Sequence, residues 1–447
     1  MALPPSNDTI AAIATAPGVG AVGIVRVSGP NTWMLADRVF RPLAGPSPSR
    51  LPPARVTLGR IFDDERLIDE ALLLNFRAPH SYTGQDLIEL QTHGGPAVLR
   101  EVLEVCLRNG ARLAGPGEFT LRAYLSGRID LVQAESVLSL VNAQSETARR
   151  QAALGLSRAL SERLDLIQNQ LTRVFGNLQA VFDYPDEGVP ESERREPLES
   201  ALAQVDELLA TARAGDMAVR GARIALVGRP NAGKSSLLNA LLGYERSLVS
   251  DTPGTTRDYL EAPLTLAGIP VTAIDTAGIR DTGDAIEASG VSRARDLAAQ
   301  ADLVLCLLDS SAPLGEEELE LARSLDPQRT LLVASKSDLA AAWSDPPGTK
   351  PLRVSTITGE GQAALKEAIR EHLTGDAGSS ELWITSERHA QALRLAREHV
   401  ERALDAPDDL AALDLEEALR ALATITGREG IAEEALEHIF ANFCVGK

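Results

Sequence analysis

Hydrophobic and polar positions in the first 120 residues alternate in short segments that predict a small α+β domain. Residues 8–30 have the pattern of a strand, a glycine-rich turn and a second strand, and residues 58–76 have that of a β-hairpin. A further strand is expected at 87–91, followed by a helix over 96–109 that ends at Gly110. We therefore expect strands and helices mixed in one N-terminal domain.

The periodicity changes twice in the rest of the chain. From Leu156 to Phe182, apolar residues recur at steps of three and four, which predicts one apolar stripe along a helix, and a second helix follows around 196–213. Residues 222–373 instead alternate continuous apolar runs with helical stretches, which predicts a mainly parallel sheet covered on both faces. A linker at 375–380 precedes a return to helix over 386–442.

These patterns predict a multidomain α/β plus α protein with helical segments on both sides of an α/β domain. We expect the N-terminal α+β domain at 1–120 and helical segments at 121–215 and 376–447. The α/β domain at 216–375 is inserted between them.

Composition excludes several classes of protein. The chain of 447 residues has 44 Lys and Arg against 63 Asp and Glu, a formal net charge of −19, which argues against a surface that coats nucleic acid. Aromatic residues are only 4%, too few for a base-stacking platform. No run of about 18 apolar residues and no secretory signal is found, so we expect a cytoplasmic protein without a membrane span. Three cysteines cannot form a disulfide framework, which fits a reducing compartment.

The strongest chemical signal lies at 228–235, where the residues GRPNAGKS fit the pattern G-x-x-x-x-G-K-[ST] between a predicted strand and a predicted helix. The glycines allow backbone N–H groups to surround phosphates, and the helix N-terminus adds positive potential. Lys234 is placed to reach the β and γ phosphates, and Ser235 to bind Mg²⁺. The inserted domain is therefore predicted to be a Ras-like P-loop domain.

Three later segments indicate a guanine nucleotide. Asp275 follows a strand, where a carboxylate can hold Mg²⁺ through water, and the N–H of Gly278 can bond a γ-phosphate. Asp338 follows another strand and can accept two hydrogen bonds from guanine N1–H and the 2-amino group, which adenine does not offer in that pattern. Ser355 and Thr356 follow the last strand and can present a backbone N–H to guanine O6.

Two positions depart from the usual guanine-binding pattern, and a third departs from Ras. Ser335 stands where Asn is usual and Thr356 where Ala is usual. Because Ser is shorter than Asn and lacks the amide, we expect one tie between the base loop and the phosphate loop to be lost. A lost neutral hydrogen bond is worth about 0.5–1.5 kcal/mol, which predicts weaker affinity with guanine preference retained. Ile279 stands where a Ras-like protein has its catalytic Gln, and a hydrocarbon cannot orient water. Residues 250–258 are the expected switch I, with Thr256 as the second protein ligand of Mg²⁺.

The expected nucleotide contacts gather in these loops. They are Asn231, Ala232, Gly233, Lys234, Ser235, Ser236, Ser250, Asp251, Thr252, Pro253, Gly254, Thr255, Thr256, Asp275, Thr276, Ala277, Gly278, Ser335, Lys336, Asp338, Ser355 and Thr356.

The chain resembles the MnmE (TrmE) family of tRNA-modification GTPases. The resemblance is carried by Asn231 in the phosphate loop, by the switch residues 254–258 (GTTRD) and by the ending 443–447 (FCVGK). N-terminal segments agree as well, among them 8–15 (DTIAAIAT) and 129–135 (IDLVQAE), so the resemblance covers essentially the whole chain.

The resemblance implies a fold and an activity. It implies an N-terminal folate-binding domain that also forms a constitutive homodimer. It also implies one discontinuous helical domain, whose parts at 121–215 and 376–447 are interrupted by an inserted Ras-like G domain. Its partner would be the flavoprotein MnmG, in a heterotetramer that handles tRNA mainly as a complex. Together they would add a carboxymethylaminomethyl or aminomethyl group at carbon 5 of the wobble uridine of certain tRNAs. A tetrahydrofolate derivative such as 5-formyltetrahydrofolate would supply the one-carbon unit, and glycine or ammonium the amine.

The resemblance also implies a GTPase that K⁺ activates when two G domains pair. The K⁺ ligands would be Asn231, Ser250, Thr252 and Thr255. Glu287 matches a Glu of switch II thought to orient the attacking water through a second water, although by itself it reads as a solvated helix residue. Arg280 is a weaker candidate for ordering switch II, and Lys234 completes the catalytic set around the phosphates.

Four positions match the folate contacts of the family: Arg26, Glu89, Arg128 and Lys447. A pterin offers paired donors to a carboxylate, and the anionic glutamyl tail suits guanidinium or ammonium groups. Arg128 replaces a common Lys, and Val19 replaces a frequent Arg. Cys444 either takes part in the one-carbon chemistry or packs the tail, whereas Cys106 and Cys306 are expected to be structural.

Two other functions remain open from the residues. A ribosome-assembly GTPase would have a similar G domain, but it usually attaches a basic RNA-binding domain, whereas the flanks here are acidic. A folate-dependent transferase with a degenerate G domain is the other, and the intact Lys234, Ser235, Thr256 and Asp275 argue against degeneration.

Overall fold

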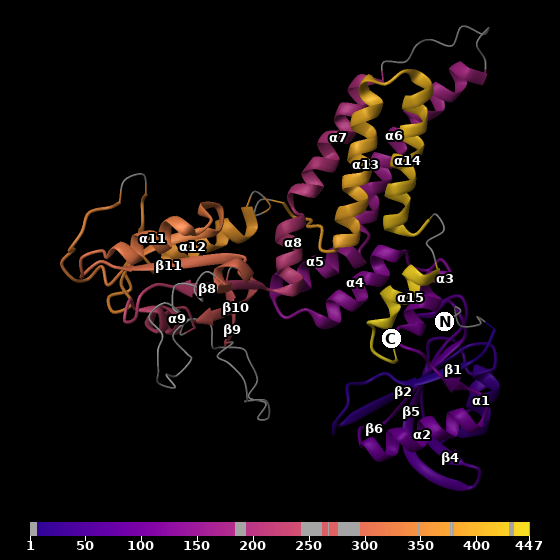
Figure 1. Ribbon diagram of the computed structural model, residues 1–447. Coiled ribbons are helices and arrows are strands. Elements are labelled where there is room, and N and C mark those ends of the chain that lie inside the picture. Colours follow the sequence, from indigo (N-terminus) through magenta and orange to yellow (C-terminus); the bar gives the residue numbers. More distant parts are fainter. Residues whose placement is uncertain are drawn as a thin grey trace. The chain divides into compact units, whose positions relative to one another are not determined.

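The computed structural model describes residues 7–183, 194–242, 262–266, 268–275, 296–346, 349–375, 377, 380–428 and 433–446. The chain divides into two compact units, one that joins residues 1–138 to 423–447 and one that comprises 139–422 (Figure 1). The four-domain division expected from the sequence is finer than these two units and stays a prediction.

The described part of the first unit contains a seven-stranded sheet in the order β3-β4-β5-β6-β2-β1-β7. Neighbouring strands are antiparallel except β1 and β7, which are parallel. The strands are β1 (Ile10–Ile13), β2 (Val22–Ser28), β3 (Phe40–Pro42), β4 (Val56–Asp63), β5 (Arg66–Phe76), β6 (Leu87–His93) and β7 (Arg112–Leu113). The predicted strand–turn–strand and the predicted hairpin are confirmed as β1–β2 and β4–β5. The two-residue and three-residue strands β7 and β3 are too short to leave a sequence pattern.

Two helices cover one face of this sheet. α2 (Pro96–Arg108) confirms the predicted helix, and α1 (Thr32–Val39) was not predicted. Leu35 of α1 and Val102 of α2 pack in one buried cluster with Val25, Leu73 and Leu90 of the sheet. The alternation of the strands therefore points their apolar residues at these helices.

The opposite face of the sheet is covered at one end and open at the other. Over β1, Phe119 of α3 (Glu118–Leu125) packs against Ile10. Over β4 and β5, Val56, Leu58 and Leu72 are 55%, 47% and 37% exposed, and Leu58 lies directly opposite Leu72 in the sheet. These three residues are called the β4–β5 strip.

The chain end belongs to the first unit. α4 (Leu131–Asn142) and α15 (Glu433–Ala441) accompany it, and Phe443 is buried in a cluster with residues of α3 and α4. Val445 forms an isolated antiparallel bridge with Pro116. This places the carbonyl of Gly446 3.3 Å from Nη1 of Arg26 on β2, which donates to it.

The second unit has a six-stranded sheet within its described residues, in the order β13-β12-β11-β8-β10-β9. The strands are β8 (Ala222–Val227), β9 (Ala262–Leu266), β10 (Ile269–Asp275), β11 (Leu303–Asp309), β12 (Thr330–Ser335) and β13 (Leu352–Val354). All pairs are parallel except β9 with β10, which confirms the mainly parallel prediction and adds an antiparallel edge. α9 (Lys234–Leu242) and α12 (Gln362–Thr374) pack on one face, and α11 (Glu316–Ser324) on the other.

Long helices form the rest of this unit (Figure 1). They are α5 (Glu146–Leu156), α6 (Ala159–Asp183), α7 (Arg195–Ala210), α8 (Ala212–Arg220), α13 (Glu387–Asp405) and α14 (Asp408–Thr426), whose last residues, from Ala423, belong to the first unit. The helix expected around 196–213 is two helices, because α7 ends at Ala210 and α8 begins at Ala212. Within the described helices of the chain, none has the length and apolar character needed to cross a membrane.

The single apolar stripe predicted from Leu156 to Phe182 is wrong at both ends. Leu156 is the last residue of α5, and the φ of Arg158 is 71°, which an α-helix does not allow, so α6 starts afresh at Ala159. Phe182 is 44% exposed. Between these ends the stripe is buried, from Leu160 to Leu178.

Candidate functional site

The phosphate loop lies between β8 and α9, the strand-and-helix context that the motif requires. Gly228 has a φ of 147°, and an added Cβ would lie 2.5 Å from the carbonyl oxygen of Leu307, so only glycine fits. Nζ of Lys234 donates to the carbonyl oxygens of Gly228 at 2.7 Å and Arg229 at 2.9 Å. The ammonium therefore lies inside the curled loop.

An ion pair that the sequence did not predict ties this loop to α11. Nη1 of Arg229 lies 3.1 Å from Oε2 of Glu318, which also accepts from the N–H of Gly315 at 2.8 Å. Glu318 is 6% exposed, whereas the side chain of Arg229 is 47% exposed, so the pair joins a buried carboxylate to a guanidinium that reaches solvent. Nothing in the local pattern identifies this partner, because Arg229 and Glu318 lie 89 positions apart.

A side chain at the end of β12 ties the base loop to the phosphate loop. Oγ of Ser335 donates to the carbonyl oxygen of Ala232 at 2.7 Å, and the carbonyl oxygen of Leu308 lies 3.3 Å from the same Oγ. An added Cβ on Gly233 would lie 3.8 Å from Cβ of Ser335, so the two loops are close enough for the short hydroxyl to bridge them. The loss of this tie, expected from Ser in place of Asn, is therefore not found.

The predicted base residues gather at a cavity of about 200 Å³ in the second unit, lined in part by Ser335, Lys336, Asp338 and Thr356. Ser355 is fully buried behind it, and its Oγ donates to Oδ1 of Asp338 at 2.6 Å. This bond orients the carboxylate that is expected to read guanine.

The loop after β13 assigns Ser355 and Thr356 different tasks. The backbone N–H of Ser355 donates to the carbonyl oxygen of Glu360 at 2.9 Å. Its Oγ accepts from the N–H groups of Ile357 at 3.2 Å and Thr358 at 3.1 Å. One backbone N–H of this pair is expected to reach guanine O6. The N–H of Ser355 is already bonded within the loop, so the N–H of Thr356 is the remaining candidate.

Lys336 is held by a strand-end carboxylate that sequence reasoning missed. Its Nζ lies 2.6 Å from Oδ2 of Asp309, the last residue of β11, and Ser311 also donates to Asp309. Burial pushes the pKa of Asp309 upward, but the hydrogen bonds from Lys336 and Ser311 outweigh it and bring the pKa below its ordinary value. The sequence signal that could have identified Asp309 is its position at the end of a buried strand.

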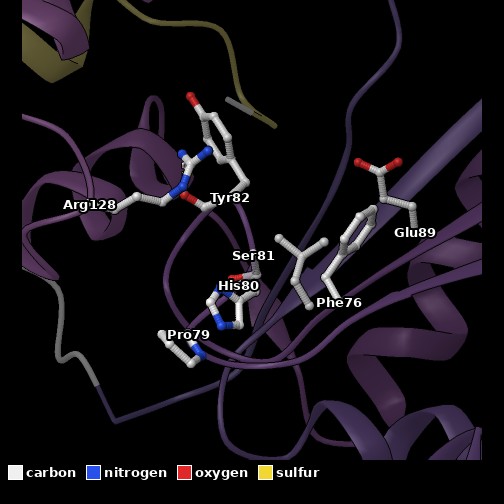
Figure 2. A pocket seen from close by; sticks show the side chains of 8 residues that line it. Phe76, Pro79, His80, Ser81, Tyr82, Glu89 and Arg128 are labelled. Atoms are coloured by element: carbon white, nitrogen blue, oxygen red, sulfur yellow. Dashed lines mark hydrogen bonds between the residues drawn. The ribbon is translucent and has the colours of Figure 1, made fainter. Parts of the chain in front are cut away.

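The first unit contains a second cavity, of about 520 Å³, that brings together residues assigned to folate by resemblance (Figure 2). Glu89 and Arg128 line it, with Phe76, His80 and Tyr82 among the other residues. Figure 2 shows Arg128 beside Tyr82, with Glu89 and Phe76 across the pocket. Sequence reasoning missed the aromatic residues, which carry no motif.

Arg26 joins this pocket through Glu89 rather than by lining it. Nε and Nη2 of Arg26 donate to Oε1 of Glu89 at 3.0 and 2.8 Å. The guanidinium groups of Arg26 and Arg128 lie 5.3 and 5.2 Å from the ring centroid of Tyr82, within cation–π range. Nη1 of Arg128 also donates to the carbonyl oxygen of Tyr82 at 3.0 Å.

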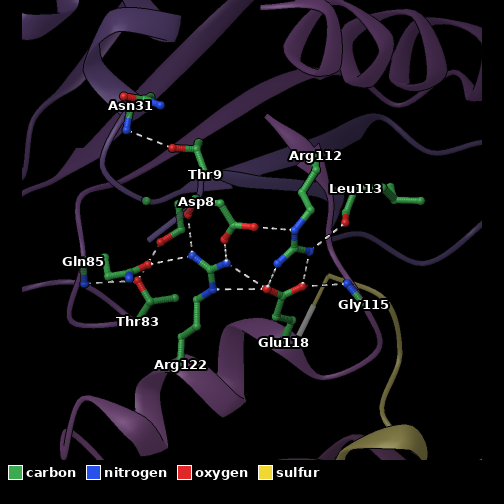
Figure 3. A network of polar contacts seen from close by, with 12 residues as sticks. Asp8, Thr9, Asn31, Thr83, Gln85, Arg112, Leu113, Gly115, Glu118 and Arg122 are labelled. Atoms are coloured by element: carbon green, nitrogen blue, oxygen red, sulfur yellow. Dashed lines mark hydrogen bonds and ion pairs between the residues drawn. The ribbon is translucent and has the colours of Figure 1, made fainter. Parts of the chain in front are cut away.

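An ionic cluster with a buried pair at its centre, Glu118 and Arg122, supports the loop that carries Tyr82 (Figure 3). Its charged members are Asp8, Arg112, Glu118 and Arg122. Nη1 of Arg122 donates to Oε1 of Gln85 in that loop at 3.0 Å. α3, which carries Glu118 and Arg122, therefore links the cluster to the loop that lines the pocket.

The three cysteines have different surroundings. Cys444 is exposed on the chain end, so packing of its side chain does not explain it. Burial raises the pKa of Cys106 and of Cys306 to about 12, which keeps both as thiols. Their expected structural role fits these positions.

Some predicted residues lie outside the described part of the chain. They are Ser250, Asp251, Thr252, Pro253, Gly254, Thr255, Thr256, Thr276, Ala277, Gly278, Arg280, Glu287 and Lys447. The backbone of Asp275 ends β10.

Comparisons with known proteins cover the whole chain. The family described as "GTP-binding protein TrmE N-terminus" matches residues 9–128, and "MnmE helical domain" matches residues 131–444. A tRNA modification GTPase MnmE from Thermus thermophilus is 54% identical over 443 residues, 99% of each chain. MnmE of Moorella thermoacetica is 41% identical over 461 residues, 99% of this chain and 100% of that protein.

Among solved structures, the G domain of the T. maritima FeoB iron transporter is 31% identical over 34% of this chain and 98% of its own, with a TM-score of 0.26. A score that low carries no argument about architecture, whereas the sequence matches extend from one end of the chain to the other. These matches show that the chain belongs to the MnmE family of tRNA modification GTPases.

Proposed function

We propose that the protein is a K⁺-activated GTPase that works with MnmG in the cytoplasm. Together they add a carboxymethylaminomethyl or aminomethyl group at carbon 5 of the wobble uridine of certain tRNAs, from a tetrahydrofolate one-carbon donor. The observation that carries the nucleotide part is the meeting of the phosphate loop and the base loop. Gly228, Ser335 and Ser355 follow or end parallel strands at their carboxyl ends, where open α/β sheets bind ligands.

In this proposal the chain's own groups bind the nucleotide at both ends. Lys234 would exchange its bonds to the loop carbonyls for the β and γ phosphates, and Asp338, oriented by Ser355, would accept from guanine. Competition by ATP as effective as competition by GTP would contradict the guanine assignment.

The residue types of the phosphate loop and of the expected switch I suit the two cations that the family implies. Ser235 lies in the first turn of α9 and supplies a hydroxyl for Mg²⁺ together with Thr256, and Asp275 would act through water. Asn231 has a φ of 63° in an exposed turn of the phosphate loop, and it would hold K⁺ with Ser250, Thr252 and Thr255. When bound, these cations supply positive charge that offsets the charge developing on the phosphates.

The test of K⁺ activation is GTP turnover in K⁺, Rb⁺ and Na⁺ at equal ionic strength, alongside detection of G-domain pairing with a transition-state mimic. We expect hydrolysis in K⁺ and Rb⁺ and a sharp decrease in Na⁺. Equal hydrolysis rates in all three salts would refute K⁺ activation. Glu287→Ala should lower turnover with nucleotide binding intact, and Arg280→Ala tests the weaker candidate.

The pocket in the first unit fits a folate. Its volume lies in the range of small-molecule sites, and it combines a carboxylate, a guanidinium and aromatic rings, which suit the donors, the anionic tail and the ring of a pterin compound. Glu89 would accept from the pterin, Arg26 would hold Glu89 in place, and Arg128 with Lys447 would meet the tail. Cys444 lies two residues before Gly446, whose carbonyl Arg26 binds, and is the candidate for a part in the transfer.

Binding of 5-formyltetrahydrofolate to the full chain, measured by equilibrium dialysis, tests this site. Arg128→Gln should weaken binding, whereas Arg60→Gln, an exposed arginine on β4 paired with Glu70, should not. No binding to the intact wild-type protein would refute the folate assignment. Cys444→Ser with full modification activity would remove that thiol from the chemistry.

We propose a homodimer formed through the open face of the first sheet. The β4–β5 strip exposes adjacent apolar residues on one face, as interaction surfaces do. Leu72→Glu should convert dimer to monomer in sedimentation velocity, and Leu395→Glu, equally apolar and 47% exposed on α13, should not. A Leu72→Glu dimer of unchanged affinity would place the interface elsewhere.

The substrate part of the proposal rests on the family and on charge. Since the net charge is −19, we expect tRNA to be bound mainly in the heterotetramer with MnmG rather than by this chain alone. Nucleoside analysis of tRNA from a deletion strain should show loss of the wobble modification. Normal tRNA with a ribosomal-subunit defect would favour a ribosome-assembly GTPase instead.

A further inference from the structure

The side chain of Ser335 has no proton left for a ligand. Its hydroxyl carries one hydrogen, and the polar atoms it contacts among the described residues, the carbonyl oxygens of Ala232 and Leu308, are both acceptors. Ser335 is 7% exposed, so a carbonyl rather than water receives that hydrogen. The hydroxyl is therefore fixed as a donor toward the protein.

Ser335 nevertheless lines the base cavity, on the side next to the phosphate loop. It contacts Ala232 and faces Gly233, whereas Asp338 lies three residues later in the base loop. A guanine whose N1–H and 2-amino group meet Asp338 turns its opposite edge, with the acceptor N7, away from that carboxylate. That edge belongs to the ring that carries the ribose and phosphates, so it faces the phosphate-loop side where Ser335 lies.

From this arrangement we propose that Ser335 forms no hydrogen bond with N7 of the bound guanine. The inference rests on the proposed guanine nucleotide site and sharpens its specificity. An Asn at this position would carry two N–H donors, one for the Ala232 carbonyl and one for N7, whereas Ser335 has a single hydrogen and Ala232 takes it. Base discrimination then depends on Asp338, positioned by Ser355, and on the N–H of Thr356.

The test compares GDP with 7-deaza-GDP, which has a C–H in place of N7 and keeps the other edge. Both are titrated against a ribose-labelled fluorescent GDP on the full-length protein with Mg²⁺, and ADP and IDP are included. We expect GDP and 7-deaza-GDP to displace the probe within about twofold of each other, because no hydrogen bond is lost. IDP, which lacks the 2-amino group, and ADP should bind more weakly.

The outcomes separate this inference from the site on which it rests. If ADP displaces the probe as well as GDP does, the guanine site and the inference both fail. If guanine is preferred but 7-deaza-GDP binds more than about fivefold more weakly than GDP, another donor such as Ser236 reads N7 and the inference alone fails.

A gain-of-contact variant supplies the converse result. Ser335→Asn should favour GDP over 7-deaza-GDP by roughly 2–10-fold, the worth of one neutral hydrogen bond. Ser335→Ala should weaken GDP and 7-deaza-GDP by the same factor, because it removes the tie to Ala232 and no contact to the base. If folded Ser335→Asn protein bound GDP and 7-deaza-GDP equally well, residue 335 would not determine whether N7 is bonded. If that variant does not fold, the ratio of the two affinities in the wild-type protein decides between the outcomes above.

Discussion

Glu118→Gln should strongly destabilise the first unit. The Glu118 carboxylate is 2% exposed and accepts from both guanidinium groups of the cluster and from the N–H of Gly115 (Figure 3). Gln keeps the size but removes the charge, which leaves Arg112 and the buried Arg122 with Asp8 as their remaining carboxylate partner in the cluster. Removing one partner of a buried ion pair costs about 3–5 kcal/mol.

The loss should be visible in a thermal melt of the full chain at pH 7. For a unit of this size, each kcal/mol shifts the midpoint by roughly 2–4 °C, so Glu118→Gln should lower the transition of the first unit by roughly 6–20 °C. Glu146→Gln provides the matched control, since Glu146 forms an exposed pair with Arg149 and its loss should leave the melt unchanged. A Glu118→Gln protein that melts within about 2 °C of the wild type would refute the reasoning.

The same cluster predicts a pH dependence with a definite sign. Burial raises the pKa of Glu118 and of Asp8, but hydrogen bonds from Arg112 and Arg122 outweigh it, so both pKa values lie below the ordinary carboxyl range. Their contribution is present above the unfolded pKa of about 4 and disappears as the pH falls through the folded values. Gln does not titrate, so the difference between wild type and variant should narrow below about pH 4. A difference in stability between wild type and Glu118→Gln that stays constant from pH 7 to pH 3 would contradict this account.

Two further predictions use matched positions. Gly361→Ala should destabilise the second unit far more than Gly359→Ala. Both glycines have positive φ, but only at Gly361 would an added Cβ meet a backbone atom, a carbonyl oxygen of β13 that lies 1.8 Å away. Equal melting temperatures of the two variants would contradict this geometry. A maleimide should label Cys444 of the native protein quickly and spare Cys106 and Cys306, whose buried thiols have a pKa of about 12; mass spectrometry of peptides that found all three labelled at one rate would refute the burial.

The sequence by itself determined the longer strands, several of the helices and the chemical class of the nucleotide site. The parallel strands, the phosphate loop between β8 and α9 and the hairpin β4–β5 all follow from periodicity and from glycine and lysine at fixed spacings. Such signals are local, because a strand or a helix declares its buried face within a few residues. Where two helices join at a residue such as Arg158, the spacing of apolar residues continues across the break, so the sequence pattern does not reveal the break.

Only the tertiary structure decided how the side chains of the two sites are held. Arg26 meets the carbonyl of Gly446 across 420 positions of sequence, and Ser335 reaches Ala232 across 103. The last contact reversed an expectation, because the worth of a Ser in place of an Asn depends on the distance between two loops and not on the residue alone. A change of a few tenths of an ångström in the donor–acceptor distance decides whether a hydrogen bond forms. That distance is set by the packing of strands and helices, which no local sequence pattern encodes.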